Sequence, residues 1–121
     1  MLGQCLRQAL ADRTGIERFG HIACPLDEAL VEATIDISGR GWLTYELAPA
    51  AASIGGLATE LVPEFFGALA DQACITVHLH QRCGRNSHHV VEAGFKAFAR
   101  ALRQAIRVTG TGMPSTKGML A

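Results

Sequence analysis

The sequence predicts an α+β fold: a two-layer unit whose four-stranded sheet carries two helices on one face, in the order β-β-β-α-β-α, with one further helix in front. Residues 29–37 alternate between apolar and polar side chains, the period of a half-buried strand. Residues 59–73 and 86–107 instead carry apolar residues at helical spacing. A chain of 121 residues with 49% apolar residues makes one domain that can bury a core without cross-links.

The first predicted element is a helix over residues 2–13. Leu2, Leu6 and Leu10 recur every four residues, which places them on one face of such a helix. Gly15 is expected to end it, because glycine tolerates the left-handed conformation that commonly follows a helix.

Three strands are expected over residues 20–48. The first covers residues 21–24 and ends at Pro25, the second covers residues 29–37, and the third covers residues 42–47. A turn at residues 39–41 separates the second strand from the third, so these two are expected to pair as a hairpin.

The second part of the chain begins with a flexible loop, residues 49–57, and a helix over residues 59–73 that tolerates Pro63 near its first turn. The apolar face of this helix comprises Leu61, Val62, Phe65, Phe66 and Leu69. A fourth strand is expected around residues 75–80. The last helix starts at a cap on Asn86 or Ser87 and runs to about Arg107. Its expected core stripe comprises Val91, Phe95, Phe98, Leu102 and Ile106.

Composition narrows the class of protein. Eleven basic and eleven acidic residues give a formal net charge of zero, which does not suggest a nucleic-acid or membrane-surface partner. The four cysteines form no C-x-x-C pair and are expected to be reduced, mostly buried thiols of a cytoplasmic protein. No basic and apolar leader precedes the first helix, and no apolar run is long enough to span a bilayer.

The start of the last helix offers candidate metal ligands. Taking 100° per residue from His88, Glu92 lies at about 40°, Lys96 at about 80° and His89 at about 100°. Two imidazoles and a carboxylate, a ligand set for a transition metal, therefore share a stripe with an ammonium group. Spacing alone leaves an ordinary solvated helix start equally open, since this pattern is less specific than a zinc-protease HExxH.

The same segment carries a family resemblance. The residues Gly84-x-Asn86-x-His88-His89-x-x-Glu92-x-x-Phe95-Lys96-Ala97-x-Ala99-Arg100-Ala101-Leu102 resemble the second histidine motif of the imidazoleglycerol-phosphate dehydratase family. Segments 15–20, 25–30, 36–40 and 114–118 are similar to further family motifs and occur in the family's order. The resemblance covers essentially the whole chain.

The resemblance implies a two-metal manganese site in a lyase of histidine biosynthesis, which removes water from imidazole glycerol phosphate to give imidazole acetol phosphate. In such a site His88 and His89 each reach a different metal, and Glu92 completes one shell. Glu64 matches a position where some family members carry a metal-binding histidine. A charged residue on a solvated helix face is an equally good interpretation of Glu64.

The resemblance also implies residues for the substrate, a small phosphate ester. Cations are expected to hold the phosphate: Arg18, Arg40 and Lys96, with Ser115 and Lys117 from the tail. Asp27 matches an acidic residue near the family's site and is the candidate catalytic residue. Without the resemblance, a turn residue after Pro25 is an equally good interpretation of Asp27.

Family members consist of two similar halves, each with one histidine motif, and this sequence carries only the second. Residues 1–15 resemble the last helix of the first half, residues 16–110 the second half, and residues 111–121 a tail with a phosphate-contact signature. The resemblance implies a homo-oligomer whose sites are shared between subunits. An apolar patch is expected where the first half would pack, and with it self-association. The alternative function is a truncated, non-catalytic metal-binding or assembly module that retains half of the site.

Overall fold

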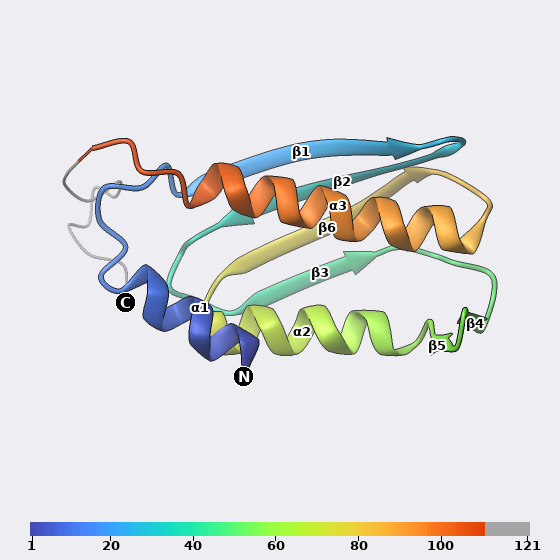
Figure 1. Cartoon of the computed structure of the whole chain (residues 1–121), viewed down its shortest axis with the longest axis horizontal. Coiled ribbons are helices and arrows are strands. Elements are labelled where there is room, and N and C mark those ends of the chain that lie inside the picture. Colours follow the sequence, from blue (N-terminus) through green and yellow to red (C-terminus); the bar gives the residue numbers. More distant parts are fainter. Residues whose placement is uncertain (111–121) are drawn as a thin grey trace.

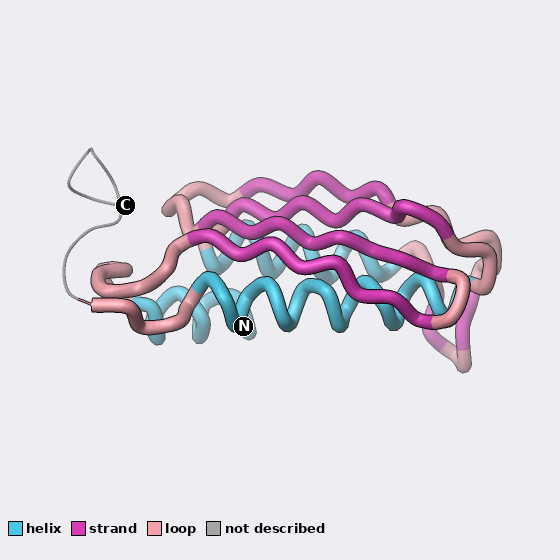
Figure 2. The backbone as a smooth tube through the Cα atoms, turned by 90° about the horizontal axis from the view of Figure 1, so that it is seen from above, coloured by secondary structure: helices cyan, strands magenta, loops and turns pink. Residues whose placement is uncertain are grey.

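The computed structural model describes residues 1–110, so the expected tail, with Ser115 and Lys117, lies outside the described residues. The expected α+β fold is confirmed: a four-stranded sheet forms one layer and the helices lie on one of its faces (Figures 1 and 2). The elements are α1 (Leu2–Leu10), β1 (Phe19–Leu26), β2 (Ala29–Asp36), β3 (Trp42–Glu46), β4 (Ser53–Ile54), β5 (Leu57–Ala58), α2 (Leu61–Ala73), β6 (Thr76–Cys83) and α3 (Ser87–Ala105).

The expected hairpin of residues 29–37 with residues 42–47 is wrong. The strand order is β1-β2-β6-β3, so β6 lies between β2 and β3 and pairs antiparallel with the first and parallel with the second. The parallel pair needs a crossover, which α2 supplies. The inward side chains of β6, Val77 and Leu79, are fully buried, whereas Leu43 and Tyr45 of β3 are half-buried. The burial of these inward side chains thus agrees with a central position for β6 and an edge position for β3.

The hairpin of this fold joins β1 to β2 through a two-residue turn at Asp27 and Glu28. The N–H of Ile37 donates to the carbonyl of Arg18 at 3.0 Å, which sets the alternation of hydrogen-bonded pairs along the ladder. By that alternation Pro25 takes a position whose nitrogen faces the open edge, where no donor is needed. This explains why β1 continues to Leu26 instead of ending at Pro25.

Two further boundaries differ from the expectation. Helix α1 ends at Leu10, because Ala11 and Arg13 adopt positive φ angles of 49° and 64° before Gly15 is reached. The expected loop 49–57 contains most of a small hairpin, β4 and β5, which closes at two glycines with positive φ, Gly55 and Gly56. The N-terminus of α2 is at Leu61, which places Pro63 in its first turn.

The face that α3 turns to the sheet is made of small residues, not the expected bulky stripe. Its buried positions include Ala93, Gly94, Ala97, Ala101 and Ala105, whereas Phe95 is 36% exposed and Leu102 and Ile106 are half-buried. Only Val91 and Phe98 of the expected stripe are buried. A Cβ added at Gly20 of β1 would lie 2.0 Å from the carbonyl oxygen of Ala101, so helix and strand approach closely. Small side chains permit that approach.

The bulky residues of α3 pack sideways against α2. Phe65, Phe66, Phe95 and Phe98 form an aromatic cluster with centroid distances between 4.8 and 5.6 Å. The outer members of this cluster stay partly exposed, Phe65 at 42%, and Leu61 on α2 is 52% exposed. The helix layer therefore presents large apolar side chains to its surroundings.

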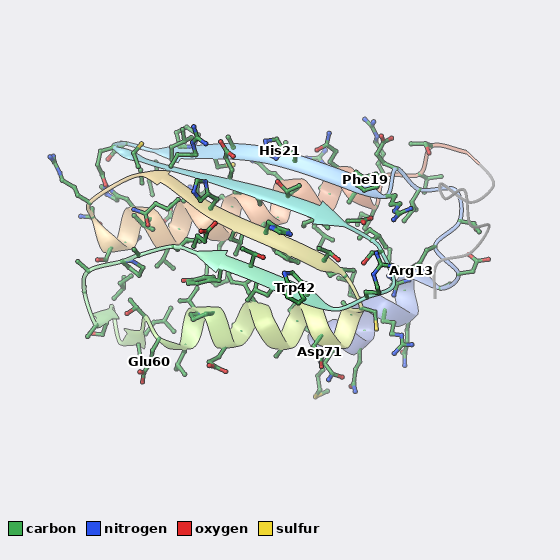
Figure 3. The ribbon with its side chains drawn as sticks, turned by 180° about the vertical axis from the view of Figure 1, so that it is seen from behind. Arg13, Phe19, His21, Trp42, Glu60 and Asp71 are labelled. Carbon is green, nitrogen blue, oxygen red and sulfur yellow. The ribbon has the colours of Figure 1, made fainter. Side chains whose placement is uncertain are left out.

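Helix α1 packs on the C-terminal part of α2. A Cβ at Gly3 would meet the Cβ of Gln72 at 2.6 Å, so the two helices are in close contact. Arg13, 2% exposed, donates to the carbonyls of Ala73 and Cys74 at 2.9 and 3.1 Å and thereby caps the end of α2 (Figure 3).

The four cysteines are free, as expected, but only Cys24 is buried. Cys5 lies on the exposed side of α1 and Cys83 ends β6 at the surface, so the expectation of mostly buried thiols is wrong. Within residues 1–110 no helix is both long and apolar enough to cross a membrane.

Candidate functional site

The candidate site begins where α3 begins. The side-chain oxygen of Asn86 accepts the N–H of His89 at 3.1 Å and caps the helix, as the sequence predicts. Gly84, with φ 138°, turns the chain in a space where a Cβ would meet Val90 and Ala29 at about 3 Å. This turn and cap place both histidines on the first turn of α3, next to the β1–β2 turn.

His88 belongs to a row of three polar side chains along α3. Its Nε2 lies 2.9 Å from Oε1 of Glu92, and Oε2 of Glu92 accepts from Nζ of Lys96 at 2.8 Å. The hydrogen bond from Lys96, followed by that from His88, lowers the pKa of the Glu92 carboxyl. Glu92 is therefore an ionised ligand candidate at neutral pH. Of the predicted stripe, His88, Glu92 and Lys96 are in contact, whereas His89 is not part of this row.

His89 belongs to a different group. Its Nδ1 lies 2.6 Å from Oε1 of Glu28, and its Nε2 lies 3.8 Å from Oδ2 of Asp27. The second oxygen of Glu28 accepts the N–H groups of Arg85 and Asn86, both at 2.9 Å. The hydrogen bond to His89, followed by those to Asn86 and Arg85, lowers the pKa of Glu28 to about 2.

Sequence reasoning singles out Asp27 in this turn and misses Glu28. The structure brings both to His89, and Glu28 makes the shorter contact. The available signal was the acidic pair in a tight turn between two strands.

The geometry of His88 and Glu92 fits a divalent metal. Nitrogen and oxygen ligands lie about 2.0–2.2 Å from a bound metal, so two ligands at a right angle are about 3 Å apart. The two atoms are 2.9 Å apart, which fits such a pair and equally the direct hydrogen bond between them. The two histidine rings are 6.3 Å apart between centroids and contact different carboxylates. Within residues 1–110 no three histidine, cysteine or acidic side chains converge into a ready metal cage.

Glu64 is exposed on the first turn of α2, and the N-terminal ends of α2 and α3 lie at the same end of the molecule (Figure 1). No hydrogen bond or ion pair joins Glu64 to His88, His89 or Glu92. Its placement is compatible with both interpretations of this residue.

The two candidate arginines lie at the opposite end. Arg18 precedes β1 and Arg40 precedes β3, whereas Asp27 follows β1. Nine residues of extended chain put Arg18 about 30 Å from Asp27. Arg18 also binds Asp36, with Nε and Nη2 at 2.6 and 3.2 Å from the carboxylate oxygens, an ion pair that sequence reasoning misses. The structure therefore separates the predicted site residues into a metal end and an arginine end.

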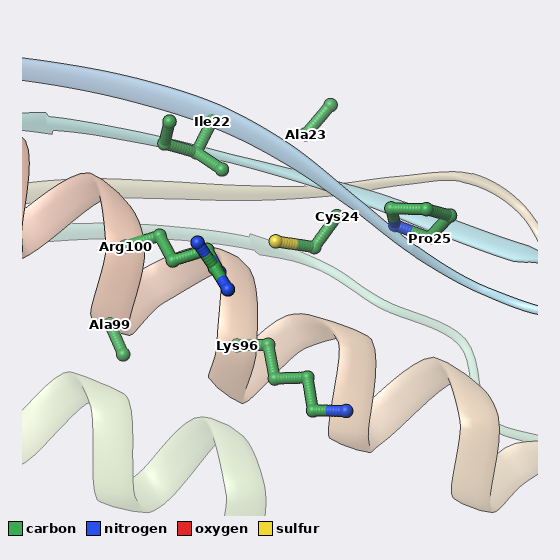
Figure 4. Close-up of a pocket in the computed structure, with 7 residues that line it drawn as sticks. All are labelled: Ile22, Ala23, Cys24, Pro25, Lys96, Ala99 and Arg100. Carbon is green, nitrogen blue, oxygen red and sulfur yellow. The ribbon is translucent and has the colours of Figure 1, made fainter.

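Lys96 also lines a groove of about 570 Å³ between the open edge of β1 and α3 (Figure 4). Ile22, Cys24 and Pro25 form its strand wall, and Ala99 and Arg100 continue its helix wall. The histidines of the sheet, His78 and His80, are exposed and alternate with the buried Val77 and Leu79, so they lie on the face away from the helices and outside the site.

Comparison with known proteins assigns the family. The family model described as imidazoleglycerol-phosphate dehydratase matches residues 1–102. A relative of that description from Trichodesmium erythraeum is 53% identical over 122 residues, covering 98% of this chain and 57% of its own length. The chain thus spans a little over half the length of this relative.

Solved structures agree. The crystal structure of imidazoleglycerol-phosphate dehydratase from Staphylococcus aureus matches with a TM-score of 0.85 and 40% identity, covering 91% of this chain and 63% of that one. The structure from Pyrococcus furiosus, determined in complex with (S)-C348, matches with a TM-score of 0.87 and 38% identity, covering 98% and 65%. The chain therefore belongs to the imidazoleglycerol-phosphate dehydratase family.

Proposed function

We propose that this chain supplies one metal-binding half of a manganese-dependent dehydratase that converts imidazole glycerol phosphate to imidazole acetol phosphate in histidine biosynthesis. The observation that carries the proposal is the pair of His88 Nε2 and Glu92 Oε1, held 2.9 Å apart at the spacing of neighbouring metal ligands. Family membership supplies the reaction.

The reaction removes a proton from one carbon and a hydroxide from its neighbour, and the resulting enol becomes the ketone. Manganese, when bound, would supply Lewis-acid polarisation of the substrate. Glu92 and the two histidines would hold and orient the metals. Lys96 keeps Glu92 ionised and in place through its 2.8 Å contact. Asp27, exposed and 3.8 Å from His89, would serve as the proton acceptor or donor.

The position of the arginines supports sites that are shared between subunits. Three carbons separate imidazole and phosphate in the substrate, whereas the arginine end lies about 30 Å from the metal end of the same chain. If Arg18 or Arg40 holds the phosphate, it belongs to another subunit than the metal ligands do. Arg40 is the better candidate, because Asp36 already binds two nitrogens of Arg18.

The exposed apolar side chains of the helix layer, Leu61, Phe65 and Phe95, support association through that face. In the full-length family the other half-repeat is the expected occupant. A chain of this length on its own is expected to self-associate, and light scattering tests this. A sharp monomer at high concentration would contradict it.

One experiment separates the proposed enzyme from the alternative, a non-catalytic metal-binding or assembly module. The purified chain is incubated with Mn²⁺ and imidazole glycerol phosphate, and imidazole acetol phosphate is measured. The His88→Ala variant is compared with His80→Ala, a control on the exposed outer face of the sheet. Product that depends on His88 and not on His80 supports the enzyme. Metal binding without product supports the module. The lack of a complete ligand cage within residues 1–110 favours that alternative. Product unaffected by His88→Ala would contradict the proposed site.

A further inference from the structure

Glu28 has more contacts than a turn residue needs. It is the second residue of the two-residue turn between β1 and β2, and its side chain is 27% exposed. One carboxylate oxygen accepts two backbone N–H groups, from Arg85 and Asn86, and the other meets Nδ1 of His89 at 2.6 Å. The carboxylate therefore joins the β1–β2 turn, the loop before α3 and the first turn of α3.

These contacts determine which nitrogen of His89 carries the proton. A neutral imidazole has one N–H donor and one acceptor nitrogen, and the hydrogen bond made by one nitrogen decides the role of the other. A carboxylate oxygen accepts, so Nδ1 donates to Glu28. The lone pair of His89 is then on Nε2, which faces Asp27 at 3.8 Å.

We infer that Glu28 is a positioning residue, which fixes His89 as its Nδ1–H tautomer and directs Nε2 toward a metal. The inference rests on the proposed function, in which His89 is a metal ligand. When a carboxylate binds one nitrogen of a histidine and a metal binds the other, the carboxylate orients the ring and raises the basicity of the nitrogen that binds the metal. His88 has no such support: its Nε2 contacts Glu92, itself a ligand candidate, and its side chain is 62% exposed against 28% for His89. Of the two imidazoles, His89 is the preorganised one.

The isosteric variant Glu28→Gln makes a directional test. Its amide oxygen can still accept the N–H groups of Arg85 and Asn86, which keeps the turn in place. Its NH₂ group then faces Nδ1 of His89 and donates to it, so the ring must change to the Nε2–H tautomer and lose its free Nε2 lone pair. The variant Glu28→Asp keeps a carboxylate on a shorter side chain. It is expected to retain part of the Nδ1–H tautomer of His89 and part of the Mn²⁺ affinity. Glu46→Gln, exposed on β3, is the matched control.

Two measurements decide the inference. The ¹⁵N chemical shifts of the His89 ring in metal-free protein at pH 8 report its tautomer. We expect Nδ1–H in the unmodified chain and in Glu46→Gln, and Nε2–H in Glu28→Gln. Calorimetric titration with Mn²⁺ should show 10- to 100-fold weaker binding for Glu28→Gln, the range typical of a lost supporting residue. Circular dichroism establishes that the variant is folded.

The outcomes separate the inference from the function on which it rests. An Nε2–H tautomer in the unmodified chain, or Mn²⁺ affinity that changes less than twofold in Glu28→Gln, overturns the role of Glu28 and leaves the proposed function intact. The expected tautomers together with no binding of Mn²⁺ to the unmodified chain confirm the orientation of His89 and overturn the proposed metal site.

Discussion

The separation of the metal end from the arginine end makes a quantitative prediction for mixed oligomers. His88→Ala disables the metal end and Arg40→Ala disables the arginine end, and each variant alone is expected to lose turnover. If every site takes its metal ligands from one subunit and its arginine from another, random mixing in equal amounts draws an intact metal end half of the time and an intact arginine end half of the time. The mixture should then recover about a quarter of the unmodified activity.

The assay compares the two variants, co-expressed or mixed and refolded so that subunits exchange, with the unmodified chain. A mixture of His88→Ala with Glu92→Gln is the matched control: both lesions lie at the metal end, 2.9 Å apart, so no subunit supplies an intact set and no recovery is expected. Arg40 is preferred to Arg18, whose loss would also break the ion pair with Asp36. If the mixture of His88→Ala and Arg40→Ala is no more active than either variant alone, one subunit supplies both ends and the argument from the 30 Å separation is refuted.

Three further predictions concern stability. Arg13→Met removes two charge-assisted hydrogen bonds to the end of α2, each of which contributes roughly 1.5–3 kcal/mol. Because the cost of burying the charge is removed as well, the free energy of unfolding in urea should fall by about 3 kcal/mol, the lower end of that sum. A loss equal to that of the exposed Arg7→Met would contradict the capping role. Gly20→Ala places a Cβ 2.0 Å from a backbone oxygen and should lower the free energy of unfolding by about 3 kcal/mol. Gly67→Ala, whose Cβ meets only a side chain at 3.8 Å, should instead stabilise α2 by about 1 kcal/mol. Equal effects of the two substitutions would show that β1 and α3 are not in close contact. Because the pKa of Glu28 falls from 4.5 to about 2 on folding, its stabilising contribution is complete above pH 4.5 and is lost as pH drops toward 2. In metal-free protein the melting temperature should therefore fall more steeply over that range for the unmodified chain than for Glu28→Gln, and parallel curves would contradict this.

The sequence predicts local features of this fold better than its pairings. The alternation of residues 29–37 and the cap at Asn86 depend on neighbours in the chain, and both are confirmed. The partner of β3 depends on a crossover of 29 residues between Glu46 and Thr76, and a glycine-bracketed turn wrongly suggested a simple hairpin. The expected orientation of α3 is wrong for a related reason. Bulky residues predict a buried stripe, but the close approach at Gly20 selects the alanine face.

The candidate site shows the same limit. His88, Glu92 and Lys96 are four residues apart on one helix, so the helical wheel places them together. Glu28 and His89 are 61 residues apart, and their contact exists only because the β1–β2 turn folds against the start of α3. The family resemblance identifies the candidate metal ligands and Asp27. Glu28, the residue that orients His89, is found only from the structure.

Direct measurement of manganese binding tests the central claim that His88 and Glu92 form part of a metal site. Mn²⁺ is titrated into the unmodified chain, Glu92→Gln and Glu46→Gln, with free Mn²⁺ followed by electron paramagnetic resonance. The proposed site predicts saturable binding that Glu92→Gln weakens tenfold or more and Glu46→Gln leaves unchanged. Equal binding by all three proteins, or no saturable binding to the unmodified chain, would contradict it.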